Sequence, residues 1–144
     1  YQCDWSSDVC SSDLDEEAFV DHYNFTPTPY DHWWGHLSSG DIRLPEGWWL
    51  LTVDGVPAAM CILDERRAAL GEGYVNVLGV RKEFRGRGLA QLLLQRAFVT
   101  FRDMGRRAVL LDVDSENTTG AVGVYERVGM RPVVVNHGYV RALS

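Results

Sequence analysis

The sequence predicts an α/β fold in which helices flank a mixed central sheet, and three observations support this prediction. Two apolar segments, 47–55 and 56–65, meet at Asp54-Gly55, a dipeptide typical of two-residue hairpin turns. Apolar residues then recur at helical spacing between Leu89 and Met104. A continuous apolar run follows at 108–113, as expected of a strand buried beneath a layer of helices.

The other elements follow from local signals. Acidic residues followed by helically spaced apolar residues predict a helix over 15–25, and Thr28-Pro29 begins a second helix over 30–37. Residues 38–47 read as a loop. Beyond the hairpin strands we expect, in order, a strand at 74–80, a helix ending at Gly105, a strand at 108–113, a helix over 118–129 and final strands at 130–135 and 138–143.

The length of 144 residues fits one domain with an ordinary hydrophobic core. No apolar run approaches the roughly 18 residues that span a membrane. Residues 1–20 lack the basic start and apolar centre of a signal peptide, so we expect a cytoplasmic protein. Only Lys82 among the fourteen cations is lysine, which is typical of GC-rich bacterial coding sequence.

The N-terminal stretch stands apart from the globular pattern. Residues 4–14, DWSSDVCSSDL, resemble the conceptual translation of a sequencing-library adapter, and their Ser and Asp content also suits a disordered tail. On either interpretation the domain is 15–144 and residues 1–14 lie outside it. Cys61 is then the one cysteine of the domain, and its apolar neighbours predict a core position.

Charge is distributed unevenly along the chain. Residues 81–107 hold eight Arg or Lys against two acids, a local balance of +6, whereas the whole chain carries −6. A compact basic segment on an acidic protein indicates a small polyanionic ligand, and it argues against nucleic-acid binding.

The basic segment contains a glycine-rich turn, RGRGLA, between a predicted strand and a predicted helix. It lacks the Gly-Lys-Ser/Thr ending that holds nucleotide phosphates and magnesium in a P-loop. It also lacks the dinucleotide fingerprint, because Gln91 stands where the third glycine belongs and the ribose-binding acid is absent near Arg106. What remains is a backbone that can approach a ligand and present helix N–H groups to negative charge.

The surrounding residues resemble the GNAT superfamily of acyl-CoA-dependent N-acyltransferases. The family's Arg/Gln-x-x-Gly-x-Gly/Ala loop corresponds to Arg85, Gly88 and Ala90 within VRKEFRGRGLA, 80–90. A second motif, NTTGAVGVYERVGM at 117–130, is similar to the family's Asn-to-Tyr helix. Together with NVLGV, it looks most like the C-terminal halves of tandem actinobacterial GNAT proteins, the group that includes mycothiol synthase.

The resemblance implies a GNAT fold in which acetyl-CoA binds as cosubstrate. Its pyrophosphate would meet backbone N–H groups of the turn, and its pantetheine arm would lie where the strand at 74–80 splays from the strand at 108–114. Gly79 would fit a bulge or a close backbone approach there, with a backbone N–H polarising the thioester carbonyl. The implied cofactor-binding residues are Leu78, Gly79, Val80, Arg85, Gly86, Arg87, Gly88, Leu89, Ala90 and Asn117.

The same resemblance assigns catalysis to Tyr125, whose hydroxyl would give a proton to the leaving CoA thiolate. Asn117 lies eight residues earlier, about two helical turns, and could also cap the helix. The general base stays open among four positions, and the histidines at 22, 32 and 36 do not form a metal-ligand set, so no metal is expected. The four candidate bases are Glu72, Asn76, Asp112 and His137.

The predicted activity is direct transfer of acetyl from acetyl-CoA to a primary amine of a small molecule or peptide. The alternative is a non-catalytic CoA-binding half of a tandem protein. Neither nucleic acid nor membrane is expected as a partner, whereas a second GNAT domain or a homodimer stays open. The family begins with a strand that would pair with 47–53, where this chain has the adapter-like segment. We therefore expect an unpaired, aggregation-prone edge at Trp48–Val53.

Overall fold

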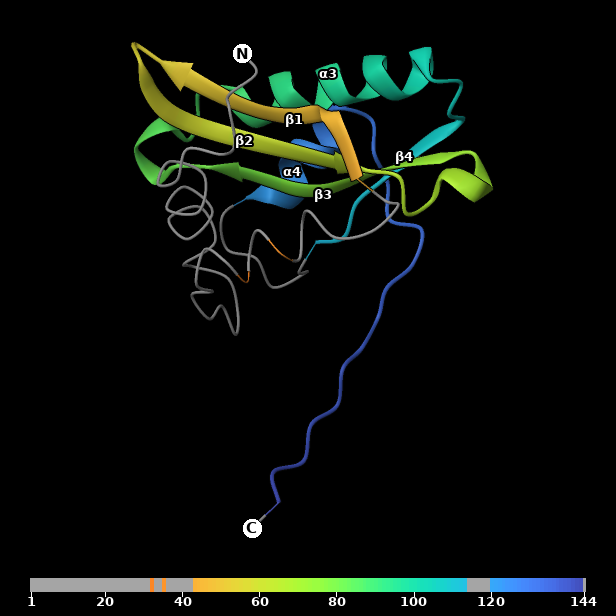
Figure 1. Ribbon diagram of the computed structural model, residues 1–144. Helices are drawn as coiled ribbons and strands as arrows, with labels where there is room; N and C mark the ends of the chain where they lie inside the picture. The colour runs from red at the N-terminus through yellow and green to blue at the C-terminus, as the bar shows by residue number, and fades with distance from the viewer. Residues whose placement is uncertain (1–31, 33–34, 36–42, 114–119, 144) are drawn as a thin grey trace.

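The computed structural model describes residues 32, 35, 43–113 and 120–143 (Figure 1). The predicted tail at 1–14 and helix at 15–25 lie outside the described residues, as does the predicted helix at 30–37 except for His32 and Gly35, both helical. The described elements are β1 (Arg43–Val53), β2 (Val56–Asp64), η1 (Ala68–Leu70), β3 (Glu72–Val80), η2 (Lys82–Phe84), α3 (Leu89–Asp103), β4 (Ala108–Leu110) and α4 (Ala121–Arg127).

The described strands form one mixed sheet, as the sequence predicts, and the order of the strands in it is β1-β2-β3-β4. The pairs β1–β2 and β2–β3 are antiparallel, and β3–β4 is parallel because α3 carries the chain back across the sheet. Asp54 and Gly55 join β1 to β2 with φ of 51° and 78°, the two positive angles of a type I′ turn. Among the described strands, β1 has β2 as its single neighbour.

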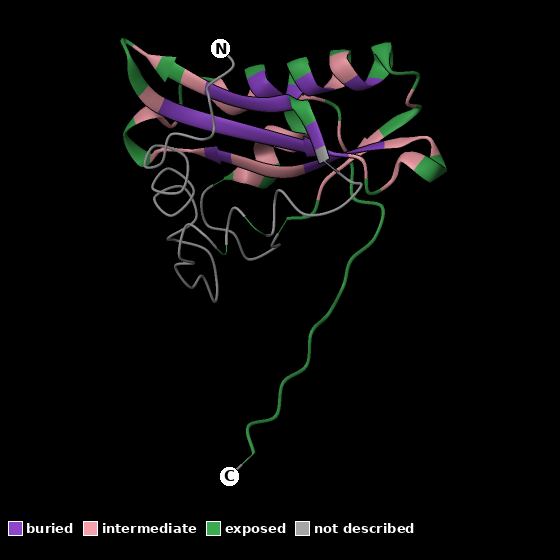
Figure 2. Cartoon of the chain, viewed as in Figure 1, coloured by how far each residue is buried: buried purple, intermediate pink, exposed green. Residues whose placement is uncertain are grey.

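One face of the sheet packs against α3 and α4 to make the core. Leu93, Leu94, Ala97 and Phe101 of α3 are buried against the alternate residues of β2 that include Cys61, and β2 is buried along almost its whole length (Figure 2). Spacings of three and four residues place these apolar side chains on one helix face, which explains why this segment folds as a helix on the sheet.

The other face of the sheet is also apolar. Trp48, Leu50, Met60 and Ile62 alternate with the core residues along β1 and β2, and each is at most 3% exposed. Because both faces of β2 are buried, its sequence is a continuous apolar run and not an alternating one.

β3 and β4 pair over only a short stretch, and beyond it the two segments separate. Its register runs from Glu72 opposite Ala108 to Tyr74 opposite Leu110 and ends there. The predicted strand at 108–113 therefore stops three residues early. From Val75 onward, the β4-facing edge of β3 has no strand partner among the described residues.

Several predicted boundaries were wrong. β1 begins at Arg43, inside the predicted loop, because an irregular register lets it continue past Pro45 at the edge of the described sheet. β3, which pairs with β2, begins at Glu72, two residues before the predicted start of that strand at 74. α4 ends at Arg127, with Gly129 following at φ 87°, close to the predicted end.

The two final strands were also wrong. Residues 130–143 have no helix or strand and leave the body of the molecule as an extended segment (Figure 1). Met130 still packs against the core, but the apolar side chains after it are exposed, with Val134 72% and Tyr139 96% exposed. The β-branched residues favour an extended backbone, but a strand also requires a neighbouring strand to pair with. The local sequence pattern does not show whether such a neighbour is present. No helix among the described residues is both long and apolar enough to cross a bilayer.

Candidate active site

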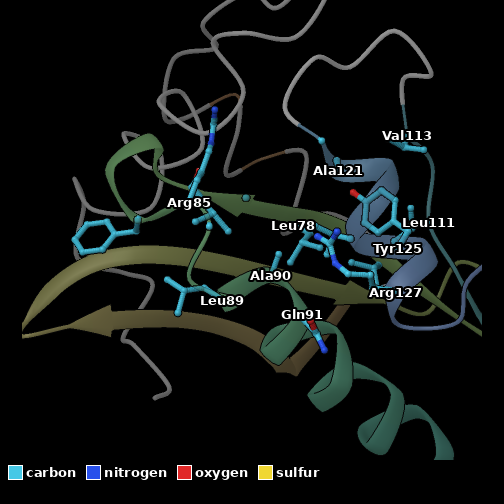
Figure 3. A pocket seen from close by; sticks show the side chains of 18 of the residues that line it. Leu78, Arg85, Leu89, Ala90, Gln91, Leu111, Val113, Ala121, Tyr125 and Arg127 are labelled. Atoms are coloured by element: carbon cyan, nitrogen blue, oxygen red, sulfur yellow. The ribbon is translucent and has the colours of Figure 1, made fainter.

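A cavity of about 930 Å³ lies where β3 and β4 separate. Its walls come from β3, the loop after it, the first turn of α3, residues 111–113 and α4 (Figure 3). Nine of the eleven predicted site residues line it: Leu78, Gly79, Val80, Arg85, Gly86, Gly88, Leu89, Ala90 and Tyr125. Arg87 does not line the cavity, and Asn117 lies outside the described residues.

The glycine-rich turn forms one end of the cavity. Gly86 and Gly88 have φ of 77° and 78°, a backbone region in which other residues are strained. Gly88 is the N-cap of α3 and has no side chain that could cap the helix. The first backbone N–H groups of α3 therefore have no capping side chain as partner. Exposed donors and the positive end of the helix dipole meet here, and such an arrangement binds anions.

The two arginines of the turn differ in their contacts. The Arg85 Nε donates to the Val80 carbonyl at 3.2 Å, which ties the turn to the end of β3. The Arg87 guanidinium lies over the Phe84 ring, 5.2 Å from its centroid, and does not itself line the cavity. The sequence could not separate these two residues, because both flank Gly86 at equal distance.

The β3 wall carries a bulge, but not at the predicted glycine. Val75 lies opposite Leu63 and Val77 opposite Ile62, which leaves Asn76 as the extra residue. Gly79 sits three residues later in regular register with Met60. The extra residue bends β3 beside the cavity, and Asn76 itself lines it.

Tyr125 reaches the cavity from α4 (Figure 3). Its ring packs against the core, and burial raises the pKa of its hydroxyl, with a smaller contribution from Cys61. The described residues include no hydrogen-bond partner for this hydroxyl. Tyr125 thus presents a protonated hydroxyl at neutral pH in a partly apolar wall.

The structure separates the four candidate bases. Glu72 is held by Arg67 at 2.7 Å and lies outside the cavity wall, and His137 belongs to the exposed C-terminal segment. Asn76 and Asp112 do line the cavity, and Asp112 is the one carboxylate among its described lining residues. Asp112 Oδ2 accepts a hydrogen bond of 2.7 Å from the Tyr74 hydroxyl.

Asp112 and Tyr125 approach the cavity from opposite sides of the sheet. Leu111 and Tyr125 both pack against the core cluster. Tyr74, the partner of Asp112, points the other way, because its neighbours Gly73 and Val75 both face the core. A tyrosine hydroxyl and a carboxylate therefore flank the cavity, and groups of these two kinds can give and take protons.

Several lining residues were not predicted as site residues, among them the three with the largest aromatic or polar side chains: Phe84, Gln91 and Arg127. Arg127 is two residues after Tyr125, which on a helix points it to another face. It nevertheless lines the cavity, from the last residue of α4. In the sequence, Gln91 is notable only because it stands where a dinucleotide-binding loop has its third glycine.

Comparison with protein families gives a match over residues 11–130 to the family described as Acetyltransferase (GNAT) family. A mycothiol acetyltransferase of Propionibacterium freudenreichii is 30% identical over 90% of this chain and 44% of its own length. The N-alpha-acetyltransferase 30 of Schizosaccharomyces pombe is 31% identical over 51% of this chain and 49% of its own length. The chain thus spans less than half the length of these relatives.

Solved structures show the same fold. A GCN5-related N-acetyltransferase from Sphaerobacter thermophilus is 34% identical and superposes with a TM-score of 0.69 over 85% of this chain and 37% of that one. The aminoglycoside N-acetyltransferase AAC(6')-Iy is 18% identical with a TM-score of 0.67, a likeness of fold alone. With the family match over most of its length, the strand–turn–helix motif and this fold, the chain belongs to the GNAT family of acetyltransferases.

Proposed function

We propose that this protein transfers the acetyl group of acetyl-CoA directly to a primary amine, with both substrates bound at once. The observation that carries the proposal is the cavity between β3 and β4, which has an anion-binding helix start at one end and Asp112 and Tyr125 in its walls. AAC(6')-Iy, which has this fold, was solved with the bisubstrate analogue CoA-S-monomethyl-acetylneamine. Because acetyl-CoA is a cytoplasmic metabolite, we expect the reaction in that compartment.

The described residues fit coenzyme A in two ways. Gly86 and Gly88 let a pyrophosphate approach the backbone N–H groups at the start of α3, a role we extend to Leu89 and Ala90. Along the free edge of β3, the backbone groups of Leu78 and Val80 can hydrogen-bond the amides of a pantetheine arm, and Gly79 lies between them with its own backbone groups toward β2. Arg85 acts mainly by holding the turn, and Asn117 remains a predicted contact.

The reaction needs two proton movements. The amine nitrogen attacks the thioester carbonyl carbon, the C–N bond forms and the C–S bond breaks. Asp112 takes the proton that the amine loses, and the Tyr125 hydroxyl gives one to the departing thiolate. The products are an amide and free CoA thiol. We assign the base to Asp112 and not to Asn76, because an amide side chain accepts no proton at neutral pH.

The binding half of the proposal is tested by thermal unfolding with acetyl-CoA, ATP and NAD in parallel. A ligand at 100 times its dissociation constant adds about 2.7 kcal/mol to the free energy of unfolding. We expect stabilisation by acetyl-CoA alone. Equal shifts with all three, or none, would remove the assignment of the cavity to coenzyme A.

The catalytic part of the proposal is tested by the substitution Tyr125→Phe. Activity is measured as the release of CoA thiol, with glucosamine, neamine and a tetrapeptide that begins with alanine as acceptor amines. Loss of the proton donor should lower kcat roughly 10²-fold. The stabilisation by acetyl-CoA should stay unchanged, because the ring is kept. Tyr139→Phe is the matched control, since Tyr139 is 96% exposed. Equal loss of turnover and of acetyl-CoA binding would contradict the role of Tyr125.

A second function is favoured by one observation. The chain spans only 44% and 49% of two acetyltransferase relatives, so it could be a non-catalytic CoA-binding half of a larger protein. In that case acetyl-CoA would stabilise the protein, but no amine and no water would accept the acetyl group, and Tyr125→Phe would change nothing.

A further inference from the structure

A chain of four side chains runs from the sheet to the cavity wall. It begins at Asp64, the last residue of β2, which is 3% exposed. Asp64 Oδ2 accepts from Arg66 Nε at 2.8 Å and from its terminal nitrogen at 2.6 Å, while Oδ1 accepts from the Arg66 backbone N–H at 3.1 Å. The paired charges hold the Arg66 guanidinium in one orientation.

The held guanidinium meets Tyr74. The Arg66 guanidinium carbon lies 4.2 Å from the centroid of the Tyr74 ring, within the range of a cation–π contact. Tyr74 lies directly opposite Asp64 in the β2–β3 ladder and is 8% exposed, so its ring is fixed from the strand side as well. Its hydroxyl donates to Asp112 Oδ2 at 2.7 Å.

Asp112 needs such a partner because its backbone is not held by the sheet. The β3–β4 ladder ends at Leu110, and Asp112 follows two residues later at the place where the strands separate. A carboxylate can rotate about its side-chain bonds, and a base that moves by about 1 Å can lose 10²-fold in rate. The Tyr74 hydrogen bond occupies Oδ2 and leaves the second oxygen for the amine proton.

We propose that Tyr74 is a positioning residue, which, backed by Arg66 and Asp64, fixes the Asp112 carboxylate at the acceptor side of the cavity. The proposal rests on the proposed function, in which Asp112 takes the amine proton. Tyr74 touches no reacting atom in it and acts through Asp112 alone. The alternative is a purely structural role, in which these contacts only stabilise the fold.

A double-mutant cycle separates the two roles. Tyr74→Phe removes one hydroxyl and keeps the ring beneath Arg66. Transfer to glucosamine, neamine and the tetrapeptide is followed by thiol release, and acetyl-CoA hydrolysis is measured without amine, so that water serves as a nucleophile that is always present. We expect kcat to fall roughly 10- to 100-fold while the KM for acetyl-CoA stays unchanged.

The decisive comparison is made in the Asp112→Asn background. If Tyr74 acts through Asp112, Tyr74→Phe should cost no further activity there, because the group that it positions is already lost. A merely structural role predicts the same fractional loss in both backgrounds, and that result would overturn the proposal. Tyr139→Phe again serves as control and should leave both backgrounds unchanged.

Two further outcomes distinguish failure of the positioning role from failure of the proposed function. If wild type is active and Asp112→Asn is impaired but Tyr74→Phe is not, the positioning role is wrong and the proposed function stands. If wild type neither transfers nor hydrolyses the acetyl group above the uncatalysed rate, the proposed function fails, and the positioning role fails with it.

Discussion

Single residues of this chain show how close packing restricts sequence where no chemistry is involved. Gly73 of β3 is buried beneath α3, and a Cβ built on it would overlap the Phe101 ring. The helix can approach the sheet at that point only because the side chain is absent. The sequence does not reveal this constraint, since Phe101 lies 28 residues farther along the chain.

Gly73→Ala should therefore destabilise the protein by about 3 kcal/mol, because overpacking a filled core shifts side chains and backbone. Phe101→Leu in the same chain should recover part of this loss, giving a favourable coupling in denaturant unfolding. Gly138→Ala is the matched control, since an added Cβ there meets no atom within 4 Å. Additive losses for Gly73 and Phe101 would show that the crowding lies elsewhere.

At the scale of an element, the turn before α3 shows which glycines serve a ligand. Gly88 and Gly105 flank the two ends of α3, and both have φ of 78° and open space where a Cβ would stand. Alanine at either position should cost stability by about 1–2 kcal/mol from backbone strain. Gly88 lines the cavity, whereas Gly105 lies at the far end of the helix and does not line it.

We therefore expect Gly88→Ala to weaken acetyl-CoA binding and Gly105→Ala to leave it unchanged, although both lower the melting temperature alike. The physical reason is that a pyrophosphate must approach the backbone N–H groups within hydrogen-bond distance. Isothermal titration calorimetry at a temperature where both variants are folded checks this. Comparable affinity for the two variants would remove the turn from the binding site.

Elements also show which features could be predicted from sequence. The I′ turn, the α3 helix with its C-terminal glycine, and the cavity-lining turn were all predicted, because short-range signals specify each of them. The predicted strands at 130–135 and 138–143 failed, as did the full length of β4, because strands depend on neighbours that local sequence does not reveal. The bulge at Asn76 depends on register with β2, which is likewise non-local.

At the scale of the whole molecule, counting charge along the chain overestimated the basic character of the site. Of the eight cations between 81 and 107, only Arg85 lines the cavity. Arg106 pairs with Glu65 at 2.7 Å, and Arg107 lies 3.7 Å from Glu72, so acids distant in sequence neutralise part of the basic segment. Arg127, outside that segment, supplies the other cation of the cavity wall.

The stability of the whole molecule should depend on alkaline pH through buried groups, and two of them, Cys61 and Tyr74, lie on opposite faces of the sheet. Burial raises the pKa of the Cys61 thiol from 9.0 to about 12. Burial, helped by the hydrogen bond to Asp112, raises the pKa of Tyr74 from 10.0 to about 12. Because both pKa values are higher in the folded state, folding favours the neutral forms. That stabilisation is complete below the unfolded pKa and is lost as pH rises through the folded pKa.

The melting temperature should accordingly fall from pH 9 toward pH 12, in addition to any loss shared by all variants. Cys61→Ala should flatten the curve from pH 9 upward, and Tyr74→Phe should flatten it only above pH 10, because each removes one titration. Each curve is referred to its own value at pH 7, which cancels the packing cost of the substitution. Curves that run parallel to that of wild type would mean that neither group is held neutral by the fold. The curve for Tyr74→Phe also tests the active site, because the hydroxyl proton whose loss it follows is the one that Tyr74 donates to Asp112.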